Sequence, residues 1–531
     1  MLFRVVLIAL AGYCLLRLWK HFWRAHTSFL RRIPSPKGGS LILGNLREVL
    51  ASRNNTDAVH ERWLQQYGPT LSYRGTFATR CLLTTDTKAI SHVLFNAYDY
   101  PKPDVARKLL GEVTGEGLLT VEGSKHKQQR KIMNPAFSHA NIGEFHEVFL
   151  DKAIQLQQIW TTECLKSSGK ARIDAVPWLT RLTLDVIART GFNHKIDSLN
   201  INDTQNEVHQ TLVEMLRVAN ESRPVRILYA RFPVLKWIPN QYRARLQAIQ
   251  GTLAHLGRQL LAEAKVAGDA EKGDNKDLFS LLVRANASPD VPINQRMNEA
   301  DVLSQVPTFL LAGHETTSTA VTWTIYYLCR YLNVQTKLRQ ELLAVSTSTP
   351  TMEELNALPY LDWVIKETMR VKPPVPSTIR VAAKDDVIPL RHPFRDTRGI
   401  LHDSIPIKKG ETIDIPISAL NRDKSLWGED AEEYWPERWE KIPEAVHAIP
   451  GVWGNMMTFL GGPRSCIGYR FSIAEMKVIL FTIVREFEME LAVPYEDIIS
   501  KASAVQRPVL KSSPKDGAQM PIFVKIYQRE G

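Results

Sequence analysis

The chain has 531 residues, of which 44% are hydrophobic and 23% are charged. This composition excludes a largely disordered protein and allows one large domain or several ordinary ones. Five scattered cysteines, an odd number, argue against a disulfide framework and for a reducing compartment. The net charge of +11 comes from dispersed lysines and arginines, which favours anionic lipid or an acidic protein partner over nucleic acid.

The N-terminus begins with an apolar run over residues 5–16 that basic and aromatic residues follow. A membrane span needs about 20 apolar residues, and this run nearly reaches that length if the flanking arginines extend to the two interfaces. No small-residue cleavage site follows, so we predict an uncleaved transmembrane anchor over residues 1–23, with a cleaved signal peptide as the alternative. A basic, proline-containing hinge over residues 24–40 then leads into a single cytosolic domain over residues 41–531.

The body of the chain shows mostly helical patterns. We expect a helix over residues 57–67 and two short strands over residues 70–73 and 80–84. From residue 125 to the C-terminus helical patterns dominate, and we find no internal repeat and no clear domain linker. The sequence therefore predicts a mainly α fold with a minor β component.

A short basic helix is expected from residue 125. His126 and Arg130 are four residues apart and share one helix face, so as a pair they could hold two carboxylates of a cofactor. A solvated basic helix explains the same spacing. Under either interpretation the lysines of this helix are left for an acidic partner surface: Lys125, Lys127 and Lys131.

A long helix is expected over residues 298–332, with Pro307 kinking or restarting it. Gly313 should weaken the helix and open space beside it. Glu315 beside Thr316 places an acid next to an alcohol, which suits a proton relay into a buried site, and Thr316 could hydrogen-bond back to the preceding turn. A polar patch on a packed helix is the alternative, and this segment alone does not decide.

Glu367 and Arg370 are three residues apart on a further helix, a spacing that forms an ion pair. Such a pair contributes little on a surface. Arg438, in the segment Pro-Glu-Arg-Trp, could complete a network with Glu367, and networks are where ion pairs affect shape.

The most informative stretch, residues 459–468, holds Cys466 in a glycine-rich loop that a long apolar helix follows. The glycines let the backbone approach a bulky partner and direct amide N–H groups at the sulfur, and the helix N-terminus adds positive potential. Both effects favour the thiolate, the form that binds a metal. Arg464 could meet an anionic group. A buried structural cysteine is the alternative, but it leaves the residues at fixed offsets unexplained.

Four motifs, in this order, resemble the cytochrome P450 family of haem-thiolate monooxygenases, and the resemblance covers nearly the whole chain. They are residues 312–317, 367–370, 436–439 and 459–468. It implies a mainly α fold that holds haem b between a long central helix and the cysteine loop, with Cys466 as the axial thiolate ligand of the iron. It also implies Glu315 and Thr316 as the pair that delivers protons to dioxygen. The residues that match structural-network positions are Glu367, Arg370 and Arg438. The residues that match haem-binding positions are Phe459, Gly462, Arg464, Gly468, His126, Arg130 and Arg380.

The resemblance to membrane-anchored, fungal-like members implies hydroxylation or epoxidation of a lipophilic small molecule at the endoplasmic reticulum membrane. Electrons would come from NADPH through a reductase. The residues expected to dock it are Lys125, Lys127, Lys131 and Lys477. We favour secondary metabolism, particularly terpenoid oxidation, with a fatty acid, sterol or xenobiotic as alternative substrates. A haem-thiolate isomerase or lyase needs no proton relay, which Glu315 and Thr316 argue against; a non-enzymatic haem sensor is the third hypothesis.

Overall fold

The computed structural model of the protein describes residues 23–40, 56–76, 79–200, 241–269, 277–502 and 505–528, together with short pieces between them. The chain divides into two compact units. Unit 1 consists of Met1–Pro103, Pro376–Ala431 and Pro443–Ser465. Unit 2 consists of Asp104–Val375, Glu432–Ile442 and Cys466–Gly531. The single domain expected over residues 41–531 stays a prediction.

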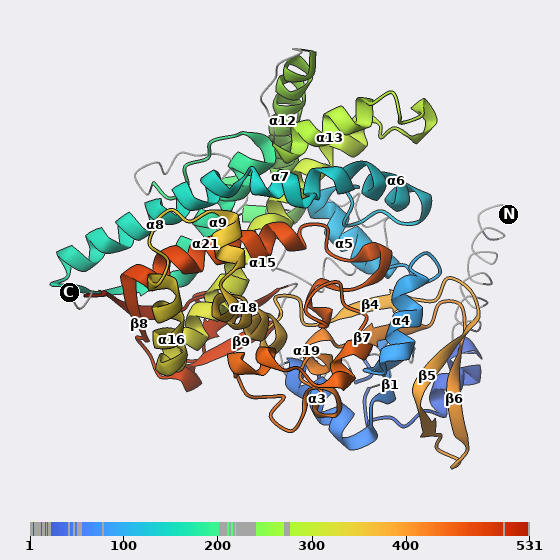
Figure 1. Ribbon diagram of the computed structural model, residues 1–531. Helices are drawn as coiled ribbons and strands as arrows, with labels where there is room; N and C mark the ends of the chain where they lie inside the picture. Colours follow the sequence, from blue (N-terminus) through green and yellow to red (C-terminus); the bar gives the residue numbers. More distant parts are fainter. Residues whose placement is uncertain are drawn as a thin grey trace. The chain divides into compact units, whose positions relative to one another are not determined.

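Unit 1 is built around a four-stranded sheet of order β1-β2-β7-β4, in which β2 and β7 are parallel and the other neighbours antiparallel (Figure 1). A second, two-stranded sheet pairs β5 with β6. The strands are β1 (Thr70–Arg74), β2 (Arg80–Thr84), β4 (Thr378–Val381), β5 (Asp386–Arg395), β6 (Leu401–Ile407) and β7 (Thr412–Ile415). The helices are α3 (Thr56–Tyr67), α4 (Thr87–Phe95), α19 (Ile417–Leu420) and α20 (Lys424–Trp427), with 3-10 turns η1 (Phe29–Arg31), η7 (Glu444–Ala448), η8 (Met457–Phe459) and η9 (Gly462–Arg464).

Unit 2 is mostly helical. Its helices are α5 (Asp104–Thr114), α6 (Gly123–Met133), α7 (His139–Gly143), α8 (His146–Lys166), α9 (Ala175–Phe192), α12 (Gln241–Asp269), α13 (Leu278–Ala287), α14 (Glu299–Leu303), α15 (Gln305–Arg330), α16 (Leu332–Leu343), α17 (Met352–Asn356), α18 (Pro359–Val371) and α21 (Tyr469–Glu486). Short 3-10 turns join them: η3 (Asn134–Phe137), η5 (Ile293–Gln295), η6 (Pro436–Glu440) and η10 (Tyr495–Asp497).

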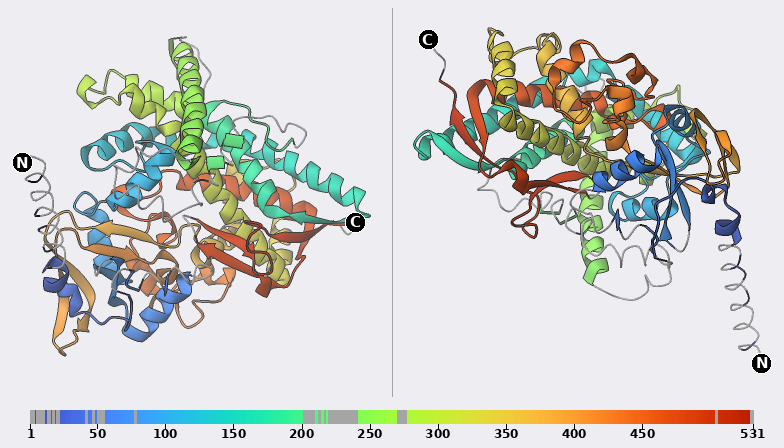
Figure 2. Two further views of the ribbon diagram at one scale, coloured as in Figure 1. Left: turned by 180° about the vertical axis from the view of Figure 1, so that it is seen from behind. Right: turned by 90° about the horizontal axis from the view of Figure 1, so that it is seen from below.

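Two small antiparallel sheets complete unit 2 (Figure 2). One has the order β3-β11-β8, and the other pairs β9 with β10. The strands are β3 (Lys170–Asp174), β8 (Phe487–Leu491), β9 (Ile498–Ala502), β10 (Gln506–Leu510) and β11 (Pro521–Ile526).

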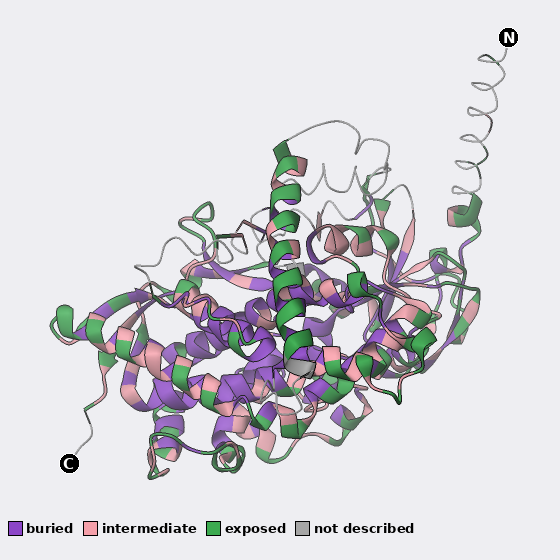
Figure 3. Ribbon diagram, turned by 90° about the horizontal axis from the view of Figure 1, so that it is seen from above, coloured by how far each residue is buried: buried purple, intermediate pink, exposed green. Residues whose placement is uncertain are grey.

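The core of unit 2 lies where α8, α9, α15 and α21 pack against one another, and in Figure 3 the buried residues gather along packed helices. The stretch of α21 from Val478 to Val484 is buried all round, the pattern of a helix in the middle of a core. Trp160 of α8 and Trp323 of α15 are among the largest fully buried side chains. Packing against α9 and α21 fixes the position of α15, which carries the predicted acid and alcohol.

The expected helix over residues 57–67 and the strands over 70–73 and 80–84 are confirmed within a residue or so, as is the mainly α fold with a minor β component. The helix expected over 298–332 is broken at Ser304, and Pro307 lies in the first turn of α15. Proline fits there because first-turn N–H groups have no intrahelical acceptor.

Within the described residues, no helix is both long and apolar enough to cross a membrane. The anchor predicted over residues 1–23 lies almost entirely outside the described part of the chain.

Candidate active site

The middle of α15 presents one accessible strip in a mostly buried helix. Ala312 is exposed and Thr316, one turn later, is partly exposed, whereas Thr317 to Ala320 are buried. The Thr316 Oγ1 hydroxyl donates a hydrogen bond of 2.7 Å to the Ala312 carbonyl oxygen, the bond to the preceding turn that the sequence predicted. The alcohol is therefore held on the helix face that small molecules can reach.

Gly313 does not open the space expected beside it. A Cβ atom at this position would lie 2.7 Å from Cγ1 and 2.9 Å from Cδ1 of Ile187, on α9. Glycine is needed because the two helices approach closely, and Ile187 fills the space that the missing side chain leaves. The expectation of an opening at Gly313 is wrong.

Glu315 is engaged by a residue that the sequence analysis did not consider. Its Oε1 atom lies 2.5 Å from the Nη2 atom of Arg507, on β10, and only 9% of the Glu315 side chain is exposed. Neither spacing nor a motif connects the two residues, so the sequence carried no signal for this ion pair.

Cys466 differs from the other described cysteines because it is exposed, while Cys81, Cys164 and Cys329 are buried. It lies three residues before α21, which begins at Tyr469. Although part of the residue is accessible, the protein atoms packed around the Cys466 sulfur remove it from bulk water and raise the pKa of the thiol. A hydrogen bond from the Gly468 backbone N–H and the charge of Arg130 lower that pKa only in part.

The Gly468 N–H acts toward the thiolate, as the sequence predicted, but desolvation by the surrounding protein outweighs it in the pKa of the thiol. A metal cation bound to the sulfur would supply the missing charge, since a coordinating thiol is deprotonated by the metal. The exposed sulfur and the nearby cation Arg130 fit a metal ligand and do not fit an inert core cysteine.

The glycines before Cys466 lie in unit 1 and serve its packing. A Cβ atom on Gly462, whose φ is +69°, would lie 2.5 Å from the Leu94 carbonyl oxygen of α4; one on Gly461 would lie 1.8 Å from the Pro450 carbonyl oxygen. Phe459 is buried edge-on against Trp453, with ring centroids 5.6 Å apart. These contacts fix the shape of the loop. Gly468, in unit 2, is more open, with Phe137 at 3.8 Å from such an atom.

Two predicted haem-binding arginines are buried in unit 1. Arg380, on β4, is 1% exposed, and its Nη1 atom donates to the Thr378 hydroxyl at 2.6 Å and the Ile379 carbonyl oxygen at 2.9 Å. Arg464 is 7% exposed, and its guanidinium lies 5.7 Å from the Tyr98 ring centroid. Buried guanidinium groups suit carboxylates such as those of a haem.

The two remaining haem-binding candidates lie on α6 in unit 2. His126 is buried, and Arg130, one turn later, is partly exposed and donates from Nε to the Asn134 side chain at 2.8 Å. Arg130 also lies close enough to Cys466 to lower its pKa. The structure thus brings Arg130, Gly468 and Cys466 together within unit 2.

Glu367, Arg370 and Arg438 form a buried network in unit 2. Arg370 donates to both Glu367 oxygens, at 2.9 Å from Nε and 2.8 Å from Nη2, and Arg438 Nε lies 3.4 Å from Oε1. Glu367 and Arg370 are 0% exposed and Arg438 is 4% exposed. The Trp439 indole N–H donates to the same carboxylate at 3.0 Å, and the backbone N–H of Trp435 donates at 2.9 Å. The sequence analysis missed the contribution of both tryptophans.

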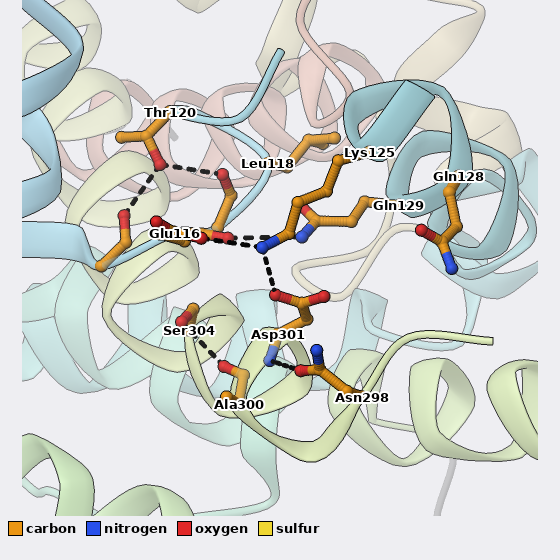
Figure 4. Close-up of polar contacts among 12 residues, drawn as sticks. Glu116, Leu118, Thr120, Lys125, Gln128, Gln129, Asn298, Ala300, Asp301 and Ser304 are labelled. Carbon is orange, nitrogen blue, oxygen red and sulfur yellow. Dashed lines mark hydrogen bonds and ion pairs between the residues drawn. The ribbon is translucent and has the colours of Figure 1, made fainter. Parts of the chain in front are cut away.

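Two lysines expected to dock a reductase form ion pairs within unit 2. Lys125 lies between two carboxylates, at 2.8 Å from Glu116 and 2.7 Å from Asp301 (Figure 4). Lys477 is 4% exposed and lies 3.2 Å from Asp362. The expectation is wrong for Lys477, whose side chain is too buried to meet a partner. For the partly exposed Lys125 it stays a prediction. Lys127 and Lys131 are exposed on α6 and stay available.

Comparison with known proteins agrees with the resemblance to cytochrome P450 enzymes that the sequence motifs indicated. The sequence model of the family described as cytochrome P450 matches residues 34–512. Cytochrome P450 monooxygenase 205 of Postia placenta is 49% identical over 510 residues, 94% of both chains. Cytochrome P450 monooxygenase 128 of the same organism is 47% identical over 516 residues, 95% of this chain and 94% of the relative. Cytochrome P450 monooxygenase claW of Ampulloclitocybe clavipes is 33% identical over 515 residues, 93% of this chain and 92% of the relative. The chain belongs to the cytochrome P450 family.

Proposed function

We propose that the chain is a haem-thiolate monooxygenase that hydroxylates or epoxidises a lipophilic small molecule with electrons from an NADPH-dependent reductase. The observation that carries this proposal is Cys466, the exposed cysteine beside Arg130 and the N-terminus of α21. Membership of the family implies a haem, and the donor set of the chain fits one.

The haem would be held by Cys466 through its sulfur and by basic residues toward its carboxylates. Within unit 2 these basic residues are His126 and Arg130. A role for Arg380 and Arg464 of unit 1 stays a prediction from the family resemblance. When bound, the haem supplies iron that a thiolate makes competent to cleave the O–O bond of dioxygen. Arg130 stabilises negative charge at the Cys466 sulfur, because it already lowers the pKa of the thiol.

On α15, Thr316 and Glu315 would carry protons. The Thr316 hydroxyl donates to the Ala312 carbonyl, so its oxygen can accept a hydrogen bond from water on the accessible face of the helix. Glu315 is the nearest acid in sequence and exchanges protons with such water. An isomerase or lyase would have no use for this pair, which favours the monooxygenase.

For the substrate, we propose a product of fungal secondary metabolism, with a terpenoid first and a fatty acid, sterol or xenobiotic as alternatives. Relatives that are fungal cytochrome P450 monooxygenases support the fungal character of the sequence. The accessible residues of α15 just before the polar ones, Leu311 and Ala312, are apolar, which suits a molecule without charge. We also propose an endoplasmic reticulum membrane location, with reductase docking near Lys127 and Lys131.

The experiment that tests the function uses the full chain with haem. The reduced carbon-monoxide complex should absorb in the band characteristic of thiolate ligation, and Cys466→Ala should abolish that band. With NADPH and reductase, the wild-type protein should yield an oxygenated product from at least one compound in a panel of terpenoids, fatty acids and sterols. Product formation that needs only a hydroperoxide, and never NADPH, would favour the isomerase or lyase.

A further inference from the structure

The ion pair between Arg507 and Glu315 joins a β-hairpin to the centre of α15. The Nη2 atom of Arg507 lies 2.5 Å from Oε1 of Glu315, and the two side chains are 24% and 9% exposed. A contact this short, with one partner largely removed from water, restricts the carboxylate far more than a fully exposed ion pair does. It uses Oε1 and leaves Oε2 for proton exchange.

The backbone beside Arg507 is itself fixed. The indole N–H of Trp323, two turns after Glu315 on α15, donates to the Gln506 carbonyl oxygen at 2.8 Å. The backbone N–H of Gln506 donates to the Pro374 carbonyl oxygen at 2.8 Å. Arg507 is in register with Lys501 of β9. The strand therefore presents Arg507 to α15 from an anchored position.

We propose that Arg507 is a positioning residue for proton delivery: its guanidinium holds the Glu315 side chain in one orientation through the contact with Oε1. This inference rests on the proposed function, because it takes Glu315 and Thr316 as the proton-delivering pair. Arg507 acts through Glu315 and touches no reacting atom itself. Without the guanidinium, the Glu315 side chain loses the contact that fixes its Oε1 atom.

The test compares Arg507→Ala, Arg507→Lys and Glu315→Gln in the full-length holoenzyme, with 7-ethoxycoumarin as the probe. Arg507→Ala should lower NADPH-driven dealkylation per haem by roughly tenfold, because a misplaced acid loses much of its catalytic contribution. Arg507→Lys should recover most of that loss, since an ammonium can still pair with Glu315. Dealkylation driven by cumene hydroperoxide should be unchanged in the two Arg507 variants, because the hydroperoxide brings its O–O bond already formed and protonated.

A merely structural role for Arg507 predicts a different pattern. Arg507→Ala would then lower the hydroperoxide-driven and NADPH-driven rates equally, which would overturn the inference. Equal NADPH-driven rates for Arg507→Ala and wild type would also overturn it.

A double-mutant cycle measured by thermal unfolding tests the ion pair between Arg507 and Glu315 without any enzyme turnover. Arg507→Ala and Glu315→Gln should be non-additive in the unfolding midpoint by on the order of 1 °C, and strict additivity would count against the contact. The proposed function fails if the wild type oxidises neither 7-ethoxycoumarin nor any panel compound, whether NADPH and reductase or cumene hydroperoxide is supplied. The cycle still reports on the ion pair in that case, so the two failures are distinguishable.

Discussion

Removing the charge of Glu367 should destabilise unit 2 severely. This carboxylate is 0% exposed and accepts from Arg370, from Arg438 and from the backbone and indole N–H groups of Trp435 and Trp439. In Glu367→Gln the shape is kept, but the amide N–H₂ faces donors and two buried guanidinium groups lose their counter-charge. Breaking a buried ion pair from one side costs about 3–5 kcal/mol, a large part of the roughly 5–15 kcal/mol that stabilises a typical domain.

The measurement is urea unfolding of the haem-loaded protein, followed by far-ultraviolet circular dichroism and by haem absorbance. Trp439→Phe is the matched control, because it removes one donor from Glu367 and leaves the ion pairs intact. Its cost should be about 1.5–3 kcal/mol, the contribution of one hydrogen bond to a charged group. A loss for Glu367→Gln smaller than that of Trp439→Phe would refute the reasoning.

Three further predictions follow from single contacts. Burial raises the pKa of Asp414 despite the opposing effects of His60 and Tyr73, so the stability that this carboxyl contributes is present in acid and is lost as pH rises through the raised pKa. Asp414→Asn should therefore unfold at a higher temperature than wild type at about pH 8 but not at about pH 4, as differential scanning fluorimetry can measure. Gly313→Ala should cost about 1–3 kcal/mol because its methyl group meets Ile187, and adding Ile187→Val should recover part of the loss in urea unfolding. Thr316→Ala should retain haem but release more hydrogen peroxide per NADPH, and unchanged coupling would remove Thr316 from the proton path.

Much of the local structure could be predicted from the sequence because short-range rules govern it. Pro307 can only be accommodated near a helix start, and the helix indeed restarts just before it. The three-residue spacing of Glu367 and Arg370 predicted their ion pair, which the structure contains. These outcomes depend on backbone geometry within a few residues.

The remainder depended on contacts between distant segments. Arg507 reaches Glu315 only because β10 is anchored on α15, and Lys477 is buried because α21 lies in the core. Desolvation raises the pKa of Cys466 more than Gly468 and Arg130 lower it. The sequence does not show how much water the fold removes from the sulfur. No pattern within one segment carries that information.

The tight packing of Gly461 and Gly462 affects how mutagenesis of the cysteine loop should be interpreted. An added methyl group at either position would collide with a backbone carbonyl oxygen, of Pro450 or Leu94. Alanine variants there would report on the folding of unit 1 even if the cofactor never approached the two glycines. Loss of absorbance in such a scan is therefore poor grounds for naming a ligand, whereas Gly468→Ala, with its nearest neighbour at 3.8 Å, is a cleaner probe.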